Sequence, residues 1–358
     1  MSKKIKVANR FIGKGEPVFI VIEIGSNYNQ DLLTAKKMID IIKAAGADAV
    51  KFQIFKERKL YTPNAGKVDY LKKDVQINDL VKKAEVPDDT HRQLFNYCKK
   101  VGLLYLSSVS DEESADYLED LGVAAYKITS YDLTNHFLLR HVAKKKKPVI
   151  LSTGAGTDKE VAEAVKIIKK CGNKQIILMQ CVAQYPAEYR YANLKVMAVY
   201  EKTFGTPAGI SDHSLDPYII PYAAAAMGAK IIEKHFTLDR RQEGPDHSFA
   251  VEPGELKQMI FGIRQIESAL GSGKKGVTAG DEKLRKFAFR CIFAVKNIKK
   301  GEKISYGNSY VLRPGKKSRG IAAKFYEKIQ GVKAKNDISA NQAIKWEDLL
   351  VKNKNHEN

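Results

Sequence analysis

The chain has 358 residues, of which 44% are hydrophobic and 28% are charged, a composition that excludes collagen-like, disordered and disulfide-scaffold proteins. Its 61 Lys and Arg against 41 Asp and Glu give a formal net charge of +20. The lysines lie in short runs along the whole chain and are not interleaved with aromatic residues. This pattern is typical of solvated surfaces, so we do not expect a nucleic-acid partner.

The cysteines Cys98, Cys171, Cys181 and Cys291 are widely spaced, with no CxxC pair and no His cluster near them. This spacing predicts small buried thiols in a reducing compartment rather than a zinc site. The N-terminal region has no sustained apolar segment, and no run approaches the about 20 residues of a membrane-spanning helix. We therefore expect a cytoplasmic protein that does not contact a membrane.

From residue 18 to residue 270, one unit recurs: a short β-branched run, a polar or turn-rich break, and a segment of helical periodicity. The predicted strands are 18–24, 47–52, 103–108, 123–128, 148–152, 175–181, 207–211 and 229–236. Alternating strands and helices imply a parallel sheet of the α/β class. Eight such units predict a (β/α)₈ (TIM) barrel, and the absence of GxGxxG after the first strand counts against a dinucleotide-binding sheet.

The connection from Ile54 to Glu85 is longer than a barrel requires, and two interpretations stay open: a lid over the substrate, or a plain surface excursion. We place the barrel domain at 1–270, a Gly- and Lys-rich linker at 271–287 and a small β-rich domain at 288–358.

The small domain contains a near-repeat at a spacing of forty residues. Its first copy is Ala294, Ile298, Gly301 and Ile304, and its second is Ala334, Ile338, Asn341 and Ile344. Gly and Asn at equivalent places predict two turns that need a left-handed residue, since Asn tolerates that conformation best after Gly. The repeat therefore indicates internal pseudo-symmetry.

Polar residues close most of the predicted strands, and in a barrel the carboxyl ends of the strands form the active site. In chain order they are Glu23, Asn27, Lys51, Gln53, Lys127, Ser130, Ser152, Gly154, Tyr185, Ser211, Asp212, His213, Glu233, Lys234 and His235. Buried charges are costly unless they are paired or face a ligand, so their convergence indicates a binding site. For Glu233 and Lys234 a purely structural ion pair is an equal alternative.

His213 and His235 close neighbouring predicted strands, which places two imidazoles on one rim. Two neutral His ligands with open positions suit Mn²⁺, Fe²⁺, Co²⁺ or Zn²⁺. Lys127, Ser130 and the turn at 152–154 add a cation, hydroxyls and free backbone N–H groups, the components of a phosphate cradle.

At these residues the sequence resembles the sialic acid synthase family, whose members condense phosphoenolpyruvate with an amino sugar to make nonulosonic acids. The matching segments are 23–29, 51–53, 126–130, 152–154, 185–186, 209–214, 233–239, 244–247 and 313–315. GISDHS at 209–214 and EKHFTLD at 233–239 are the most specific of them. The resemblance implies a barrel joined to a C-terminal antifreeze-like (SAF, β-clip) domain. It also implies a domain-swapped homodimer, in which the small domain of one chain covers the barrel mouth of the other.

The resemblance also implies a role for each matching residue. His213 and His235 would bind a divalent metal, with Mn²⁺ as our first choice and Mg²⁺ or Co²⁺ as alternatives. The phosphoenolpyruvate site would consist of Lys51, Lys127, Ser130, Ser152, Gly154 and Ser211. The amino sugar would contact Gln53, Tyr185 and Asp246, together with Arg313 of the partner chain. We add Asp132, in a run where this sequence departs from the family pattern, as a further candidate contact of the sugar. Glu23 would lie between the substrates as an acid, a base or an orienting carboxylate.

Several positions depart from the best-known sialic acid synthases: Tyr28, the run Thr129 to Asp132, and Ala183. The pair Tyr131-Asp132 and the run GPDHSFAVEP at 244–253 look closer to branches of the family that serve legionaminate or spore-coat polysaccharide synthesis, so the sugar stays open between N-acetylmannosamine and a 2,4-diacetamido-trideoxyhexose. Two other functions stay open as well. Another phosphoenolpyruvate-condensing 3-deoxy-ulosonate synthase would not need the SAF domain, and a non-catalytic basic sugar- or nucleic-acid-binding protein would leave the metal and lysine positions idle.

Overall fold

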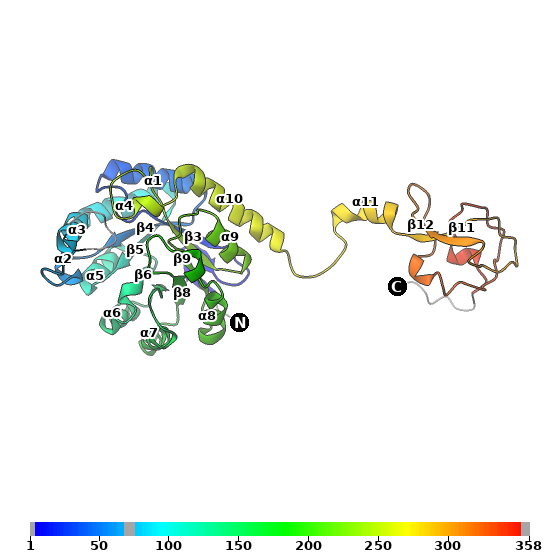
Figure 1. Ribbon diagram of the computed structural model, residues 1–358. Coiled ribbons are helices and arrows are strands. Elements are labelled where there is room, and N and C mark those ends of the chain that lie inside the picture. The colour runs from blue at the N-terminus through cyan, green and yellow to red at the C-terminus, as the bar shows by residue number, and fades with distance from the viewer. Residues whose placement is uncertain (1–3, 68–75, 352–358) are drawn as a thin grey trace. The chain divides into compact units, whose positions relative to one another are not determined.

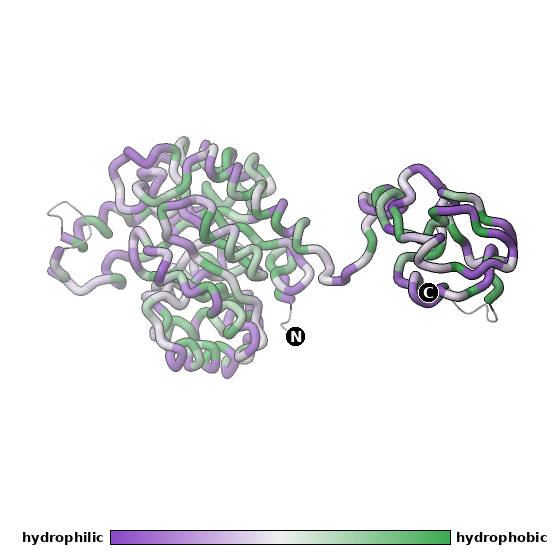
Figure 2. The backbone as a smooth tube through the Cα atoms, turned by 45° about the vertical axis from the view of Figure 1, so that its right-hand side comes forward, coloured by the Kyte–Doolittle hydropathy of each residue, from purple (hydrophilic) through white to green (hydrophobic). Residues whose placement is uncertain are grey.

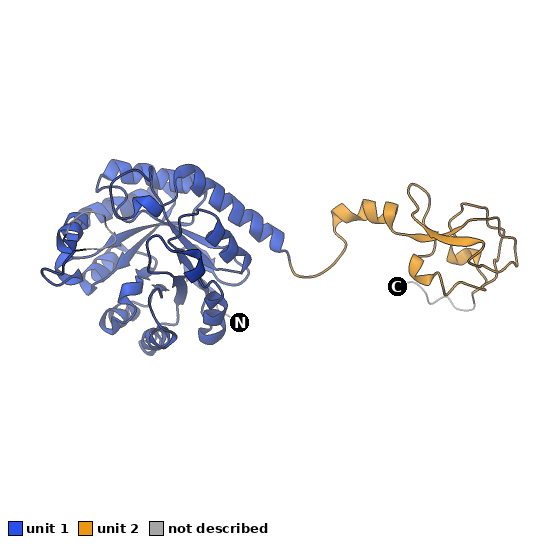
Figure 3. Ribbon diagram, viewed as in Figure 1, with its two compact units in different colours: residues 1–271 blue, residues 272–358 orange. Residues whose placement is uncertain are grey.

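The computed structural model describes residues 4–67 and 76–351 and divides the chain into two compact units, residues 1–271 and 272–358 (Figure 3). The long connection after Ile54 contains two short helices, α2 (Glu57–Leu60) and α3 (Ile77–Ala84), and its segment 68–75 lies outside the described residues. The predicted linker 271–287 includes most of helix α11 (Ala279–Ala288).

The first unit is a closed barrel of parallel strands in the order β10-β3-β4-β5-β6-β7-β8-β9, which confirms the predicted fold (Figure 1). Its strands are β3 (Phe19–Glu23), β4 (Ala49–Ile54), β5 (Leu104–Val109), β6 (Tyr126–Ile128), β7 (Val149–Ser152), β8 (Ile176–Cys181), β9 (Ala208–Asp212) and β10 (Ile231–His235). Each overlaps one of the predicted strands, and the barrel closes where β10 pairs with β3.

Helices follow the strands and surround the barrel (Figure 1). They are α1 (Leu32–Ala45), α4 (Asp88–Val101), α5 (Glu112–Leu121), α6 (His136–Lys144), α7 (Asp158–Lys170), α8 (Val196–Phe204), α9 (Ile219–Ala226) and α10 (Pro253–Leu270). Helix α1 shows why such segments are helical. Asp31 caps its N-terminus by accepting from the backbone N–H of Leu33 and Thr34, Gly46 ends it in the left-handed conformation, and its apolar face is buried.

The strands of the barrel bury both of their faces. One set of apolar side chains, including Ile20, Ile22 and Phe52, packs between the strands and the surrounding helices. The opposite set, which begins at Phe19 and Ile231, fills the amino-terminal part of the barrel interior. In Figure 2 apolar segments run through this unit and hydrophilic segments lie along its outline.

A hairpin that the sequence analysis did not predict closes the amino-terminal end of the barrel. Its strands, β1 (Ile5–Val7) and β2 (Arg10–Ile12), pair antiparallel. Ile5, Val7 and Ile12 belong to the same buried cluster as the interior strand residues. The hairpin therefore covers apolar surface that the strand ends would otherwise expose to water.

The second unit contains the antiparallel pair β11 (Cys291–Ala294) and β12 (Ser309–Leu312), with short 3₁₀ turns at Ala323–Phe325 and Trp346–Asp348. The predicted pseudo-symmetry is present in its hydrogen bonds. The backbone N–H groups of Ile298 and Ile338 each donate to the carbonyl of the other at 2.8 Å. Gly301 N–H donates to Ala334, and the equivalent Asn341 N–H donates to Ala294.

Gly301 and Asn341 have φ of 82° and 65°, which confirms the two predicted left-handed turns. The apolar members of both copies of the repeat lie in one buried cluster. None of the helices in residues 4–67 and 76–351 is long and apolar enough to cross a membrane.

Candidate active site

The inward-facing side chains change from apolar to charged toward the carboxyl ends of the strands. Glu23, Lys51, Lys127, Ser211 and Glu233 come from five strands, and each is at most 4% exposed. The register aligns Glu23 with Lys51 across β3 and β4, and Glu233 with Ser211 across β10 and β9. Strand pairing therefore brings Glu23 beside Lys51 and Glu233 beside Ser211 inside the barrel.

Two carboxylates and two ammonium groups alternate in this layer. Lys51 Nζ lies 2.7 Å from Glu23 Oε2 and 3.6 Å from Glu233 Oε1. Lys127 Nζ lies 3.5 Å from the same Glu233 oxygen, to which the Ser211 hydroxyl donates at 2.8 Å. Glu233 is thus the carboxylate that links both lysines and Ser211.

Burial and mutual attraction act in opposite directions on these groups. Burial alone would raise the pKa of Glu233, but Lys127 and Lys51 outweigh it and lower that pKa to about 2. Burial raises the pKa of Glu23, and Lys51 opposes the shift only in part. Burial lowers the pKa of Lys127, with Glu233 opposing. The layer consequently holds one firmly ionised carboxylate and one that binds a proton more readily.

A second group of polar side chains surrounds Gly25. Gln53 donates to Glu23 Oε1 at 2.8 Å. Gly25 has φ of 53°, and a Cβ on it would lie 3.1 Å from Asp246 Oδ2 and 3.1 Å from Glu23 Oε1. Burial, followed by the charge of Glu23, raises the pKa of Asp246 to about 6. Glycine at this position therefore lets two carboxyl groups and an amide approach each other.

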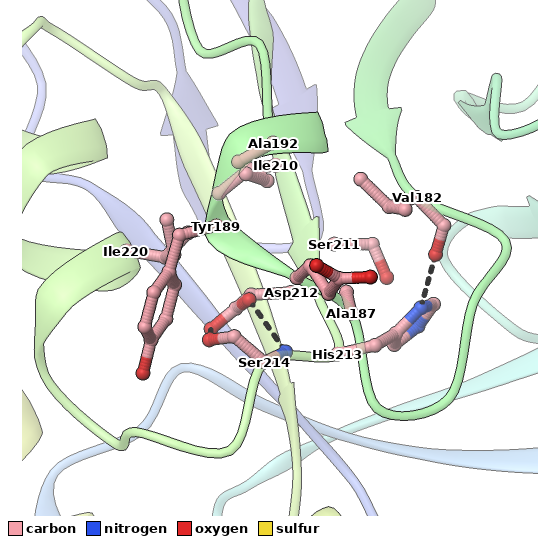
Figure 4. A pocket seen from close by; sticks show the side chains of 11 residues that line it. Val182, Ala187, Tyr189, Ala192, Ile210, Ser211, Asp212, His213, Ser214 and Ile220 are labelled. Atoms are coloured by element: carbon pink, nitrogen blue, oxygen red, sulfur yellow. Dashed lines mark hydrogen bonds between the residues drawn. The ribbon is translucent and has the colours of Figure 1, made fainter.

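His213 and His235 lie side by side, with ring centroids 5.4 Å apart. His213 Nδ1 lies 2.9 Å from the carbonyl of Val182, the contact drawn in Figure 4, so its Nε2 is left for another partner. Tyr185 stacks on His213 at 4.2 Å, and Phe249 packs against both imidazoles. His235 Nδ1 is buried without a hydrogen-bond partner, 3.5 Å from Asp246 Oδ2.

The surroundings shift the pKa values of the two imidazoles in opposite directions. Burial would lower the pKa of His213, but Cys181 and the Val182 carbonyl outweigh it and raise that pKa. Burial, and then the neighbouring His213, lowers the pKa of His235 well below its usual value, so that ring is neutral. Within the described part of the chain, no group of three or more His, Cys, Asp or Glu side chains is arranged to bind a metal ion. A metal held here would therefore take two protein nitrogens and complete its shell with water or substrate oxygens.

Close to Cys181, Gly154 lies in tight contact with polar groups. Its N–H donates to Ser130 Oγ at 2.8 Å. A Cβ on Gly154 would lie 2.9 Å from that oxygen and 3.3 Å from the Ala183 nitrogen. The hydroxyl of Ser152 is buried without a partner. Small residues and polar groups without partners are what a phosphate or carboxylate ligand requires.

Three other residues considered from the sequence have the following surroundings. Lys234 is buried on the outer side of the strands, where its Nζ lies 2.7 Å from Asp212 Oδ2 and 2.5 Å from the Ser214 carbonyl. The Asp132 carboxylate is held within its own turn, where it accepts from Thr129 at 2.9 Å. Arg313 is exposed and belongs to the second unit.

Sequence reasoning underestimated three residues of the site. Glu233 was weighed equally as a structural ion pair, whereas it lies at the centre of the interior layer. Phe249 and Cys181 were not selected, although Phe249 contacts both imidazoles and Cys181 Sγ lies 3.8 Å from His213 Nδ1. Cys181 follows Ile177 and Met179 at alternate positions of β8, and both of these face the barrel interior. This alternation predicts that Cys181 also faces the interior.

Family models match both units. Residues 38–275 match the model described as the NeuB family, and residues 289–350 match the SAF domain. Among curated proteins, the spore coat polysaccharide biosynthesis protein SpsE of Bacillus subtilis is 42% identical over 97% of this chain and 97% of its own length. N,N'-diacetyllegionaminic acid synthase of Campylobacter jejuni is 39% identical over 91% of this chain and 98% of its own length.

Among solved structures, the N-acetylneuraminic acid synthetase of Leptospira borgpetersenii covers 80% of this chain and 96% of its own. It is 34% identical, with a TM-score of 0.72. The similarity to these three proteins therefore extends over most of the chain.

Proposed function

This chain belongs to the NeuB family, and on that premise we propose that it condenses phosphoenolpyruvate with an open-chain N-acylated amino sugar, giving a nonulosonic acid and phosphate. The observation that carries the proposal is the pair of buried lysines beside two adjacent imidazoles at the carboxyl ends of the strands. We place the protein in the cytoplasm, where its four free cysteines would stay reduced.

In the proposed reaction, C3 of phosphoenolpyruvate forms a bond to the aldehyde carbon of the sugar, and the aldehyde oxygen takes a proton. Water adds to C2, and the C2–O bond breaks to release phosphate. Lys51, Lys127 and the buried Ser152 hydroxyl, which has no hydrogen-bond partner, support binding of the two anionic groups, because these donors are in place before the ligand arrives. Glu23, with its raised pKa, suits holding a proton beside them.

We further propose that His213, through Nε2, and His235 bind a divalent metal, with Mn²⁺ as the first choice and Mg²⁺ or Co²⁺ as alternatives. The neutral His235 ring and its buried Nδ1 without a hydrogen-bond partner support this assignment. When bound, the metal would supply Lewis-acid polarisation of the aldehyde oxygen.

For the sugar we propose Gln53, Asp132, Tyr185 and Asp246 as contacts. Gln53 and Asp246 meet at Gly25, and Tyr185 covers His213. The names of the relatives support a 2,4-diacetamido-trideoxyhexose ahead of N-acetylmannosamine, since one of them is a diacetyllegionaminic acid synthase. Replacing Asp132 by Glu should change the relative rates among sugars if its carboxylate reaches the pocket.

We also propose a homodimer in which Arg313 of one chain serves the barrel of the other. Arg313 is exposed, and α11 carries the exposed apolar side chains Leu284 and Phe287, which suits a surface covered by a second chain. A mixture of Arg313→Ala and His235→Ala chains should regain activity, because one site of the mixed dimer is then intact. No recovery after confirmed subunit exchange would contradict the swap.

The proposed function is tested by phosphate release from phosphoenolpyruvate in the presence of Mn²⁺ and each candidate sugar. We expect release with at least one N-acylated amino sugar and none without sugar. Product mass should equal that of the sugar plus pyruvate. Release with a phosphosugar alone would favour a 3-deoxy-ulosonate synthase, and no release with any sugar would leave a binding protein.

A further inference from the structure

Resting on the proposed function, we infer that Glu233 is the positioning residue of the phosphoenolpyruvate site: it holds Lys51, Lys127 and Ser211 in the arrangement that receives the anion. The inference starts from its place in the barrel. Glu233 is 2% exposed and faces inward from β10, while its three partners come from β4, β6 and β9. One carboxylate therefore connects four strands around the ring.

The distances from the two lysine nitrogens to Glu233 indicate charge attraction without good hydrogen bonds. At 3.6 and 3.5 Å, the lysine nitrogens are too far from Glu233 Oε1 for good hydrogen bonds, yet close enough for strong attraction inside a protein. The N–H groups of Lys127, and those of Lys51 that do not face Glu23, therefore stay available for a ligand while both lysines are held in position. The ion pair of Lys234 with Asp212, in contrast, closes to 2.7 Å.

Ser211 adds a second constraint. Its hydroxyl donates to Glu233 at 2.8 Å, so its only hydrogen is directed at the carboxylate and not at the ligand space. Phosphate and carboxylate ligands accept hydrogen bonds and do not offer donors when they are ionised. In this arrangement Ser211 holds Glu233 in position. The proposed effect of Ser211 on phosphoenolpyruvate binding therefore acts through Glu233.

The repulsion between Lys51 and Lys127 explains why a carboxylate is needed between them. Lys51 and Lys127 lie on the same carboxylate oxygen, so the two ammonium groups repel each other across a short gap. Glu23 offsets Lys51 at 2.7 Å, but among the described residues the ion pair of Lys127 is with Glu233. Without Glu233, Lys127 would turn away from Lys51 or leave the interior, and the two-lysine site would be lost.

The test measures phosphoenolpyruvate binding by calorimetry on the full chain with Mn²⁺ and no sugar. We expect Glu233→Gln to weaken binding at least about tenfold and Glu233→Asp, which keeps the charge, to fall between it and wild type. At saturating phosphoenolpyruvate, kcat should fall far less than the affinity, and the KM for the sugar should stay within about twofold. Unchanged or tighter binding in Glu233→Gln, or a loss confined to kcat, would overturn the inference.

A double-mutant cycle checks that Glu233 acts through the lysine. In a Lys127→Met background, Glu233→Gln should have little further effect on binding, because the group it positions is already absent. Additive effects would show that Glu233 acts independently of Lys127. If Glu233→Gln does not fold, as judged by circular dichroism, the same cycle with Glu233→Asp decides the question.

The chain offers a matched control at the opposite end of the barrel. Asp48 is also a buried carboxylate between two cations, Arg10 and Arg264. Asp48→Asn should lower thermal stability and leave phosphoenolpyruvate binding unchanged. If the wild-type protein does not bind phosphoenolpyruvate, the proposed function and this inference are both refuted. If the wild type binds it and Glu233→Gln binds it equally well or more tightly, only the inference is refuted.

Discussion

The two ends of the barrel use ion pairs in different ways. Near the amino-terminal end, Asp48 accepts from the backbone N–H of Ile20 at 2.8 Å and pairs with Arg10 and Arg264, which are partly exposed. At the carboxyl end, Lys51 and Lys127 are themselves buried. The distance from each lysine nitrogen to Glu233 Oε1 is longer than a good hydrogen bond.

The two ends differ in whether their buried polar groups all have partners within the protein. Asp48 is fully satisfied by partners within the protein, so its ion pairs can only stabilise the fold. The carboxyl end retains buried polar atoms without hydrogen-bond partners, among them Ser152 Oγ and His235 Nδ1. Such atoms cost free energy unless a ligand satisfies them, so their position beside the buried lysines and imidazoles indicates a binding site.

The largest expected effect concerns the histidines. Removing metal with EDTA, or replacing His213 or His235 by Ala, should lower phosphate release by several orders of magnitude, because an unpolarised aldehyde is a poor electrophile. Mn²⁺, Co²⁺ or Mg²⁺ should restore the EDTA-treated wild type but not the variants. Full activity in metal-free wild-type enzyme would contradict the metal assignment.

The lysines should give the next largest effect. Lys51→Ala and Lys127→Ala should each remove a charge-assisted contact worth about 1.5–3 kcal/mol, which corresponds to a roughly ten- to hundredfold rise in the KM for phosphoenolpyruvate. The matched change at the other end, Arg10→Ala, should leave that KM unaltered. Steady-state kinetics at saturating sugar measure the KM for phosphoenolpyruvate in the lysine variants and in Arg10→Ala. An equal rise in KM in both would contradict the assignment of phosphoenolpyruvate binding to the carboxyl end.

A smaller effect is expected at Gly154. Gly154→Ala would place a Cβ 2.9 Å from Ser130 Oγ, so that the hydroxyl must shift. We expect the KM for phosphoenolpyruvate to rise about tenfold, equivalent to roughly 1.4 kcal/mol. Gly254→Ala is the control, since a Cβ there meets nothing within 4 Å. An unchanged KM in Gly154→Ala would place the phosphate elsewhere.

The smallest effect on catalysis should come from the hairpin that closes the amino-terminal end. Ile12 is fully buried, and Ile12→Ala should destabilise the barrel by about 2–5 kcal/mol through lost burial and the cavity left behind. Thermal unfolding of the barrel measures the loss. The kinetic constants below the unfolding temperature should stay those of the wild type, and a selective rise in the KM for phosphoenolpyruvate would show that the two ends are coupled.

The sequence by itself determined the order of strands and helices, the barrel, and the repeat around Gly301 and Asn341, because hydrophobic periodicity and left-handed turns are local properties. It also placed Lys51, Lys127, His213 and His235 at strand ends. These ends necessarily meet once parallel strands close into a barrel.

Only the tertiary structure decided which face each polar side chain occupies. Glu233 and Lys234 are adjacent in the sequence, yet one faces the interior and the other packs with Asp212 outside it, since alternate residues of a strand point to opposite faces and the register fixes which. Likewise, the convergence of Gly25 with Asp246, and of the hairpin with the far end of the barrel, joins segments distant in the chain. Local patterns carry no record of such contacts, because they form only when the sheet closes.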